Sequence, residues 1–196
     1  SGEPNLLDQV KAWLAETYQK KGNVFLGLLH RLDRPVAGVV LFAKTSKAAA
    51  RVSRLFRERR VEKIYRALLQ GAIAPPAGSL VHHLGERDPL SKTVPVSDEP
   101  RAGTKPAKLH YRTLWSDGRR SVVEVQLETG RKHQIRAQFA KVGHPIAGDR
   151  RYGATERFHD RAIGLVAIRL IVEHPITKQS LTIELPEALS SVKSEK

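Results

Sequence analysis

One carboxylate lies among basic side chains in residues 30–35 (HRLDRP), the first segment whose residue types could do chemistry. Asp33 follows His30 and Arg31 and precedes Arg34. Cations within about 4 to 6 Å of a carboxylate hold it ionised and in place, as a nucleophile or a general base requires. An ordinary ion pair that fixes a loop has the same composition, and the segment taken alone favours that plainer interpretation.

A glycine followed by closely spaced cations, in residues 130–136 (GRKHQIR), is the second such segment. The N-terminus of a helix presents backbone N–H donors to an anion, and Arg131 and Lys132 could add charge-assisted contacts with phosphate. The predicted helix places Lys132 and Arg136 on one face, from which Arg136 can point inward. A solvated basic face explains the segment equally well.

The elements that must position these two segments follow from hydrophobic periodicity. Apolar residues three and four apart predict an amphipathic helix over 6–18 that buries one face. The consecutive apolar residues 38–43 predict one strand covered on both sides, and Thr45 or Ser46 would then cap a helix through Arg60. The segment around Asp33 is thus expected to lead directly into a buried strand.

Hairpins dominate the rest of the chain. Strands are expected over 62–69, 109–115, 123–127, 165–172 and 180–185. Asp117 and Gly118 supply the hairpin turn between the second and third of these, and a helix ended by Gly143 follows the segment at 130–136. Residues 80–105 are interpreted as short strands and exposed loops. The predicted class is α+β, with a mixed, largely antiparallel sheet flanked by helices.

The basic composition of the chain restricts its partners. The sequence has 34 Lys and Arg against 20 Asp and Glu, a formal net charge of +14. Because the basic residues recur through the chain rather than in one tail, a folded surface is expected to carry them. Such a surface attracts polyanions, so a nucleic acid is the expected partner; a basic solvated surface on a small enzyme is the alternative.

Length and composition set further bounds. With 196 residues, of which 40% are hydrophobic, a single domain over 1–196 is expected. The absence of cysteine excludes disulfides, thiolate nucleophiles and Cys-based zinc sites, and it fits a reducing compartment. No apolar run approaches the roughly 20 residues that span a bilayer, and no secretory leader is recognised, so we expect a cytoplasmic protein.

Three separated motifs resemble the RluA family of RNA pseudouridine synthases, and the resemblance covers about residues 6–185. The motifs are HRLD at 30–33 followed by GVV at 38–40, KIYRA at 63–67, and GRKHQIR at 130–136, which continues into GHPIAGD at 143–149 and YG at 152–153. They are similar to the family's catalytic motif, its base-stacking motif and its third motif, in that order. The resemblance implies a pseudouridine synthase fold with a central RNA-binding cleft, acting as a monomer without a cofactor.

Carried over residue by residue, the resemblance implies a division of roles. Asp33 would attack or deprotonate the ribose while the uridine glycosidic bond is cleaved, and the base would rotate and rejoin through carbon. Tyr65 would stack on the flipped uracil, and Arg136 would pair with Asp33 and keep it ionised. Arg31 would enter the RNA helix near the extruded base. Further contacts with ribosomal or transfer RNA are assigned to His30, Arg34, Arg131 and Lys132.

Plainer interpretations accompany these roles. Without the resemblance, Tyr65 is a core aromatic of a strand and Arg31 is a surface cation. The basic helix at 51–60 is a candidate for phosphate contacts, although a solvated face is the simpler interpretation. Asp149, in the Gly-Asp pair of the third motif, is expected to cap or brace a turn.

Two departures from the family pattern stand out. Residues 36–38 are Val-Ala-Gly where the family commonly has Thr-Ser-Gly, so two hydroxyl groups that could brace the loop are missing. Catalysis is expected to survive, because neither hydroxyl has a chemical role. The family's first motif, a strand with a Lys-Pro pair before the first helix, is absent, and we expect the chain to lack a native edge strand.

Two other functions remain open on the sequence. A nuclease could be drawn from Asp33, His30 and His133, but metal-dependent nucleases gather several carboxylates, and no second acidic residue lies beside Asp33. His82 and His83 would point to opposite sides of a strand, so no metal site is expected there. A non-catalytic RNA-binding module acting in ribosome assembly fits the charge equally well, but such a module has no need for an anion in its groove.

Overall fold

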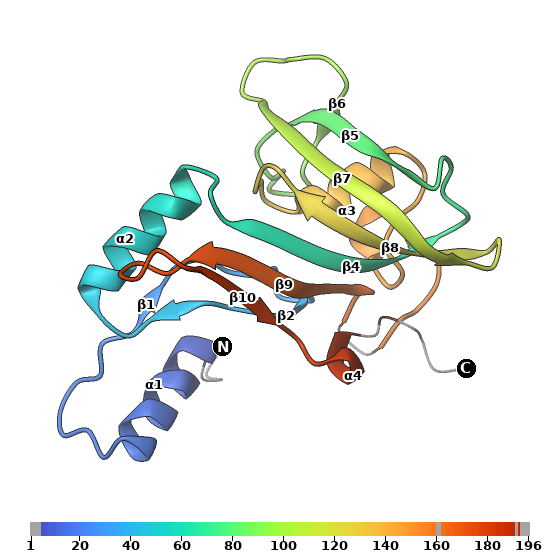
Figure 1. The fold of residues 1–196 in the computed structure, drawn as a ribbon. Helices are drawn as coiled ribbons and strands as arrows, with labels where there is room; N and C mark the ends of the chain where they lie inside the picture. Colours follow the sequence, from blue (N-terminus) through green and yellow to red (C-terminus); the bar gives the residue numbers. More distant parts are fainter. Residues whose placement is uncertain (1–4, 160–161, 191, 193–196) are drawn as a thin grey trace.

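The computed structural model describes residues 5–159, 162–190 and 192, and its centre is one twisted, mostly antiparallel sheet (Figure 1). Its strands lie in the order β10 (Ser180–Glu184), β9 (Leu165–Glu173), β4 (Glu62–Gln70), β8 (Arg120–Leu127), β7 (Lys105–Ser116), β5 (Ala77–Leu84) and β6 (Val96–Ser97). The short β2 (Ala37–Gly38) pairs with β9 in parallel, and the other pairs of this sheet are antiparallel. The predicted α+β class is confirmed.

Helices and a small second sheet surround this core. They are α1 (Leu6–Thr17), β1 (Gly27–Leu28), β3 (Phe42–Ala43), α2 (Ser46–Arg57), α3 (Gln134–Lys141), the 3-10 helix η1 (Arg150–Tyr152) and α4 (Glu187–Ser190). β1 and β3 pair antiparallel to form the two-stranded sheet. Within the part of the chain that the structure describes, no helix combines the length and the apolar character needed to cross a membrane.

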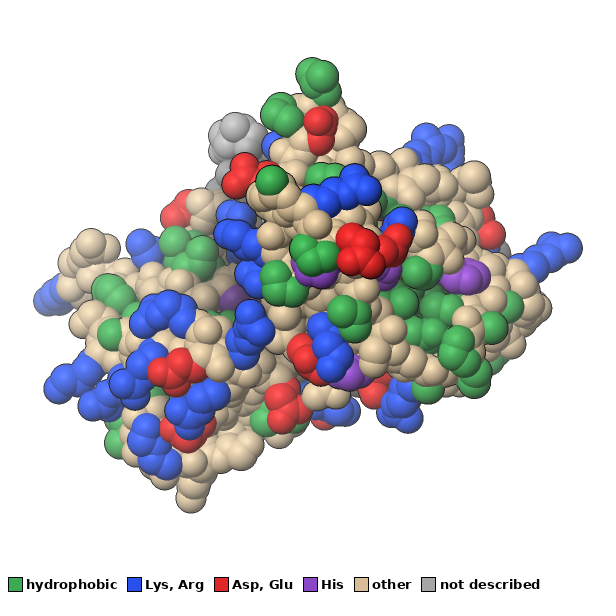
Figure 2. All heavy atoms as spheres, turned by 90° about the horizontal axis from the view of Figure 1, so that it is seen from above, with side chains coloured by type: hydrophobic (Ala, Val, Ile, Leu, Met, Phe, Trp, Pro, Cys, Tyr) green, Lys and Arg blue, Asp and Glu red, His purple; other side chains and the backbone are tan. Residues whose placement is uncertain are grey.

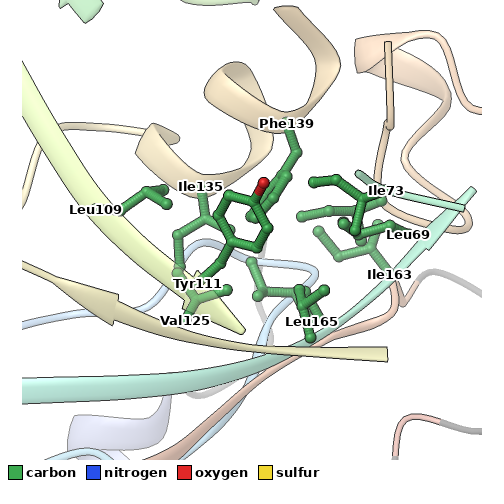
Figure 3. Packing of buried hydrophobic residues seen from close by; sticks show 12 residues of the cluster. Leu69, Ile73, Leu109, Tyr111, Val125, Ile135, Phe139, Ile163 and Leu165 are labelled. Carbon is green, nitrogen blue, oxygen red and sulfur yellow. The ribbon is translucent and has the colours of Figure 1, made fainter. Parts of the chain in front are cut away.

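The main core fixes α3 on one face of the sheet (Figure 3). Phe139 is fully buried, and its ring meets Tyr111 of β7 edge-on with 5.7 Å between the centroids. Ile135 lies one helical turn earlier in the same cluster. Burial of side chains of this size contributes about 2 to 3 kcal/mol each, so α3 is held firmly. Arg136, on the same helix, is therefore held in a defined orientation.

The apolar run 38–43 does not form the single strand that was predicted. β2 ends at Gly38, which has φ +130° and lies so close to Ala167 of β9 that a side chain there would clash with its backbone. The chain then leaves the large sheet, and the Leu41 N–H donates to His30 Nε2 at 3.0 Å. It next enters β3 in the small sheet. A run of apolar residues thus joins two sheets instead of crossing one.

Two predicted helix boundaries also move. α2 begins where expected, with the Thr45 side chain accepting from the Ala48 N–H at 3.1 Å, but it ends at Arg57 rather than Arg60, and Arg59 has a positive φ of 58°. α3 begins only at Gln134, because His133 before it takes the left-handed conformation with φ 52°. Lys132 consequently lies in a turn, and the expectation that it shares a helical face with Arg136 is wrong.

The first helix buries less of its apolar face than predicted. Leu14 is the buried residue of α1, and it packs against Val24 and Leu26, which lie in the segment after the helix. Trp13 and Tyr18 remain about half exposed, at 56% and 52%. The structure places α1 beside the small β1–β3 sheet, away from the central strands (Figure 1).

Candidate active site

Three distant segments meet at one cleft, which we call the Tyr65 cleft. Asp33 comes from the loop before β2, Tyr65 from β4 and Arg136 from α3, and all three line a hollow of about 570 Å³. His30, Arg31, Arg131 and Lys132 line the same hollow. The structure therefore brings together seven of the eight residues that the sequence singled out. The eighth, Arg34, lines the neighbouring hollow described below.

Arg136 is buried between two carboxylates. Its Nε and Nη2 donate to the two oxygens of Asp149 at 2.7 and 2.9 Å, and its Nη1 donates to Asp33 Oδ2 at 3.0 Å. Burial works against the cation, but Asp149 and Asp33 outweigh it and hold the pKa of Arg136 above its ordinary value. Because Asp149 takes two donors of the guanidinium fork, the third is directed at Asp33. The face of the Tyr152 ring lies 5.0 Å from the guanidinium.

Asp149 was expected to cap or brace a turn, and it is the N-cap residue of η1, where its backbone C=O accepts from the Tyr152 N–H at 2.9 Å. Its side chain makes no cap hydrogen bond there and is only 2% exposed, because its carboxylate binds Arg136. The role of Asp149 is to fix the orientation of the arginine that contacts Asp33. The Gly-Asp pair in the third motif was the only sign of it in the sequence.

His133 is a second neighbour of Asp33. Its Nε2 lies 3.7 Å from Asp33 Oδ2, and its Nδ1 lies 2.8 Å from the Tyr152 hydroxyl, which accepts from the Val94 N–H at 2.8 Å. If the hydroxyl donates to Nδ1, the imidazole proton is on Nε2 and faces the carboxylate, whereas the other tautomer would set two acceptors against each other. Burial lowers the pKa of His133, and although Asp33 acts in the opposite direction, the pKa stays below its ordinary value. The lowered pKa favours the neutral ring.

Tyr65 lies between the main core and the cleft, a position that fits a core aromatic of a strand, while its stacking on a base stays a prediction. Its ring packs against the main core, yet it remains partly exposed and lines the cleft. The register between β4 and β9 shifts between Ile64 and Tyr65, a local irregularity of the kind that re-aims side chains beside active sites. Burial, and secondarily Asp33, raise the pKa of Tyr65 to about 12, so the phenol stays neutral. The ring thus gives the cleft an uncharged aromatic surface.

His30 is braced within the protein. Its Nε2 accepts the Leu41 N–H, and its ring stacks on Phe56 of α2 with 5.1 Å between the centroids. Burial, followed by the charge of Lys63, lowers the pKa of His30 to about 4. The RNA contact predicted for His30 would therefore come from an uncharged ring.

A second hollow, which we call the arginine groove, opens on the other side of Asp33. It has a volume of about 1130 Å³ and shares Asp33, Arg136, Arg31 and Lys132 with the Tyr65 cleft. The cations found in this groove alone are Arg34, Arg87, Arg150, Arg151 and Arg157. Asp33 is thus a carboxylate placed where two strongly basic hollows meet.

Basic residues also lie on α2 and at the start of α3. Figure 2 shows Lys and Arg side chains gathered on the side of the molecule where α2 lies. Of the basic helix, Arg57 lines the Tyr65 cleft, whereas Arg54 pairs with Glu58 at 3.7 Å. At the start of α3, the Arg131 N–H already donates to Gln134 Oε1 at 3.0 Å. An anion there would depend mainly on side chains.

The similarity of the chain to known proteins agrees with this geometry. The family model for RNA pseudouridylate synthase matches residues 3–141. The chain is 34% identical over 173 residues to the tRNA pseudouridine synthase C of Salmonella typhi, which covers 79% of the chain and 65% of that protein. It is 34% identical over 171 residues to the ribosomal large subunit pseudouridine synthase D of Neisseria meningitidis, covering 82% and 45%.

Similarity extends to solved structures. The human RNA pseudouridylate synthase domain containing 4 superposes with a TM-score of 0.78 at 25% identity, covering 96% of this chain and 82% of the other. The human domain containing 1 gives 0.72 at 27% identity, covering 91% and 74%. The chain spans 51% of an uncharacterized RNA pseudouridine synthase of Bacillus subtilis, to which it is 32% identical. Since the family model matches well over half of the chain, this chain belongs to the RluA family of RNA pseudouridine synthases.

Proposed function

We propose that this chain converts specific uridines of ribosomal or transfer RNA to pseudouridine, with Asp33 as the catalytic carboxylate. One observation carries the proposal. Both contacts to Asp33, from Arg136 and from His133, fall on Oδ2. Within the described residues Oδ1 has no hydrogen-bond or ion-pair partner, and the side chain is 28% exposed. One oxygen is thus held by the protein while the other is left without a described partner on a side chain that lines the cleft, an arrangement that suits a carboxylate that reacts with a substrate.

The reaction assigned to this site is an isomerisation. The bond between uracil N1 and ribose C1′ breaks while Asp33 attacks the sugar or takes a proton from it. The uracil rotates and a bond forms between C5 and C1′, as the bond between Asp33 and the sugar breaks or the abstracted proton returns to the sugar. The C5 proton then leaves to solvent, and N1 takes up a proton. Atoms and electrons balance without a redox step, so the proposal needs no cofactor. Arg136 would keep Asp33 in position throughout.

The surroundings of Asp33 suit a flipped nucleotide. Extruding a base from a helix costs a few kcal/mol, which stacking on Tyr65 would offset in part. Arg31 is exposed and lines both hollows, which supports a role in which it enters the RNA helix that the base leaves. Arg34, Arg131, Lys132 and His30 would contact the RNA around it.

Tritium release tests the proposal. RNA labelled at uracil C5 would be taken from cells lacking the protein, as total ribosomal and transfer RNA, and incubated without added metal or cofactor. We expect release with the wild-type chain, none with Asp33→Asn, and similar RNA affinity for both. A folded wild-type chain that binds these RNAs and releases no tritium would contradict the proposal and favour the non-catalytic RNA-binding module.

A further inference from the structure

Lys63 is a cation of the Tyr65 cleft that pairs with no carboxylate among the described residues. It lies on β4 two residues before Tyr65, so the two side chains share one face of the strand, and both line the Tyr65 cleft. Within the part of the chain that the structure describes, its ammonium has no hydrogen-bond or ion-pair partner. Arg136 differs from Lys63 in this respect, because it donates hydrogen bonds to two carboxylates.

The surroundings of Lys63 are basic. Burial, and then the charge of Arg59, lower the pKa of Lys63. A Cβ added at Gly130 would lie 2.8 Å from its Nζ, so the ammonium occupies the space beside this glycine at the cleft wall. Arg131 follows in the chain and lines the same wall. Removing a cation from water and surrounding it with like charges costs free energy unless an anion arrives.

We propose that Lys63 binds a backbone phosphate of the RNA, adjacent to the uridine that stacks on Tyr65. The inference rests on the proposed function, because it takes the base at Tyr65 as its reference point. Residues i and i+2 of a strand are about 7 Å apart, so Lys63 lies about 7 Å along β4 from Tyr65. This distance is short enough for Lys63 to contact a phosphate of the nucleotide whose base stacks on Tyr65. A nucleotide flips about its own backbone, so the phosphates that flank it lie near the pocket that receives the base. A phosphate supplies the missing negative charge, which the neutral oxygens of uracil do not.

Stability and binding should then respond to Lys63→Met in opposite directions. Removing an unpaired, half-buried cation leaves the unfolding temperature unchanged or higher. RNA affinity should fall about tenfold, as expected for loss of one charge-assisted contact. The slope of log affinity against log salt should become shallower by about 0.7 to 0.9, the value for one phosphate contact.

The test measures binding, so it does not depend on turnover. Bulk transfer RNA from cells lacking the protein, labelled at its 3′ end, would be titrated with the full chain over about 50 to 300 mM salt. Lys63→Arg keeps the charge and should restore most of the affinity and the salt slope. Lys20→Met removes the same charge from an exposed position outside both hollows and should change affinity less than about twofold.

Three outcomes would overturn the inference. Lys63→Met binding like Lys20→Met would show that no contact is lost. A weaker affinity with an unchanged salt slope would point to an uncharged partner. A lower unfolding temperature that Lys63→Arg does not restore would indicate a structural role. Absence of tritium release from the wild-type chain would count against the proposed function alone, since binding is measured separately.

Discussion

The Tyr65 cleft and the arginine groove meet at Asp33, yet they hold their polar side chains in different ways. Arg136 at the junction is 3% exposed and bonded to two carboxylates, and His30 in the cleft is held by a backbone N–H. Arg34 and Arg150 in the groove are exposed and have no ion pair within the described residues. Chemistry depends on groups fixed in position, whereas attraction of RNA requires only that charge is present. On the proposed function, arginine would therefore serve two purposes in this chain, positioning a catalytic group and attracting RNA.

Replacing the fixed arginine should have the largest effect. In Arg136→Lys the single ammonium cannot satisfy Asp149 and orient Asp33 together, so a buried carboxylate loses its partner. We expect tritium release to fall at least about a hundredfold and the free energy of unfolding to drop by about 3 kcal/mol. Arg150→Lys is the matched control and should change neither quantity. A stable and active Arg136→Lys chain would remove the distinction between the two hollows.

The stacking surface of the cleft comes next. Tyr65→Leu removes the aromatic face and should lower tritium release about thirtyfold, within the range measured for loss of one base–aromatic stack. Tyr65→Phe keeps the face and should retain most activity. Because burial raises the pKa of Tyr65 to about 12, the alkaline sides of the wild-type and Tyr65→Phe profiles should coincide. A separate alkaline limb in the wild type would give the hydroxyl a role that stacking does not explain.

Whether a feature could be predicted from the sequence depends on how far apart in the chain its interacting residues lie. Local patterns predicted the β7–β8 hairpin, the β9–β10 pair and the Thr45 cap, because turn residues and alternation act between neighbours in sequence. The meeting of Asp33 and Arg136, 103 residues apart, came only from the family resemblance. Composition and periodicity contain no information about which distant side chains will touch.

The features that the sequence did not reveal arise from tertiary packing. Gly38, the last residue of β2, pairs with Ala167 of β9 at a distance that leaves no room for a side chain, and no local pattern in the sequence predicts that contact. The partners of His133 and the isolation of Lys63 likewise depend on which elements surround them. Asp149 lies 13 residues from Arg136, across a turn whose geometry sets their alignment. Motif letters indicated where chemistry occurs, but not which groups support it.

The pH dependence of the free energy of unfolding should show whether His30 is held as an uncharged ring in the folded protein. Its pKa is about 4 in the folded protein against 6.5 for an unperturbed histidine, so between these values the unfolded chain binds a proton that the folded chain does not. The stabilisation is fully present above pH 6.5 and is lost as the pH falls toward 4, by about 2 kcal/mol after allowance for solvent screening. In His30→Gln, denaturant unfolding should show a shallower loss over this window. Equal slopes would mean that the ring is not held neutral.

The smallest effect is expected in the arginine groove. Arg150→Gln and Arg151→Gln together remove two exposed charges that contact no carboxylate within the described residues. Stability should stay within about 0.5 kcal/mol of the wild type, and tritium release at saturating RNA should be unchanged. RNA affinity should fall about threefold near physiological salt, and the deficit should vanish at high salt because screening removes the contribution of exposed charges. A loss of turnover at saturating RNA would show instead that these arginines are fixed parts of the catalytic machinery, as Arg136 is.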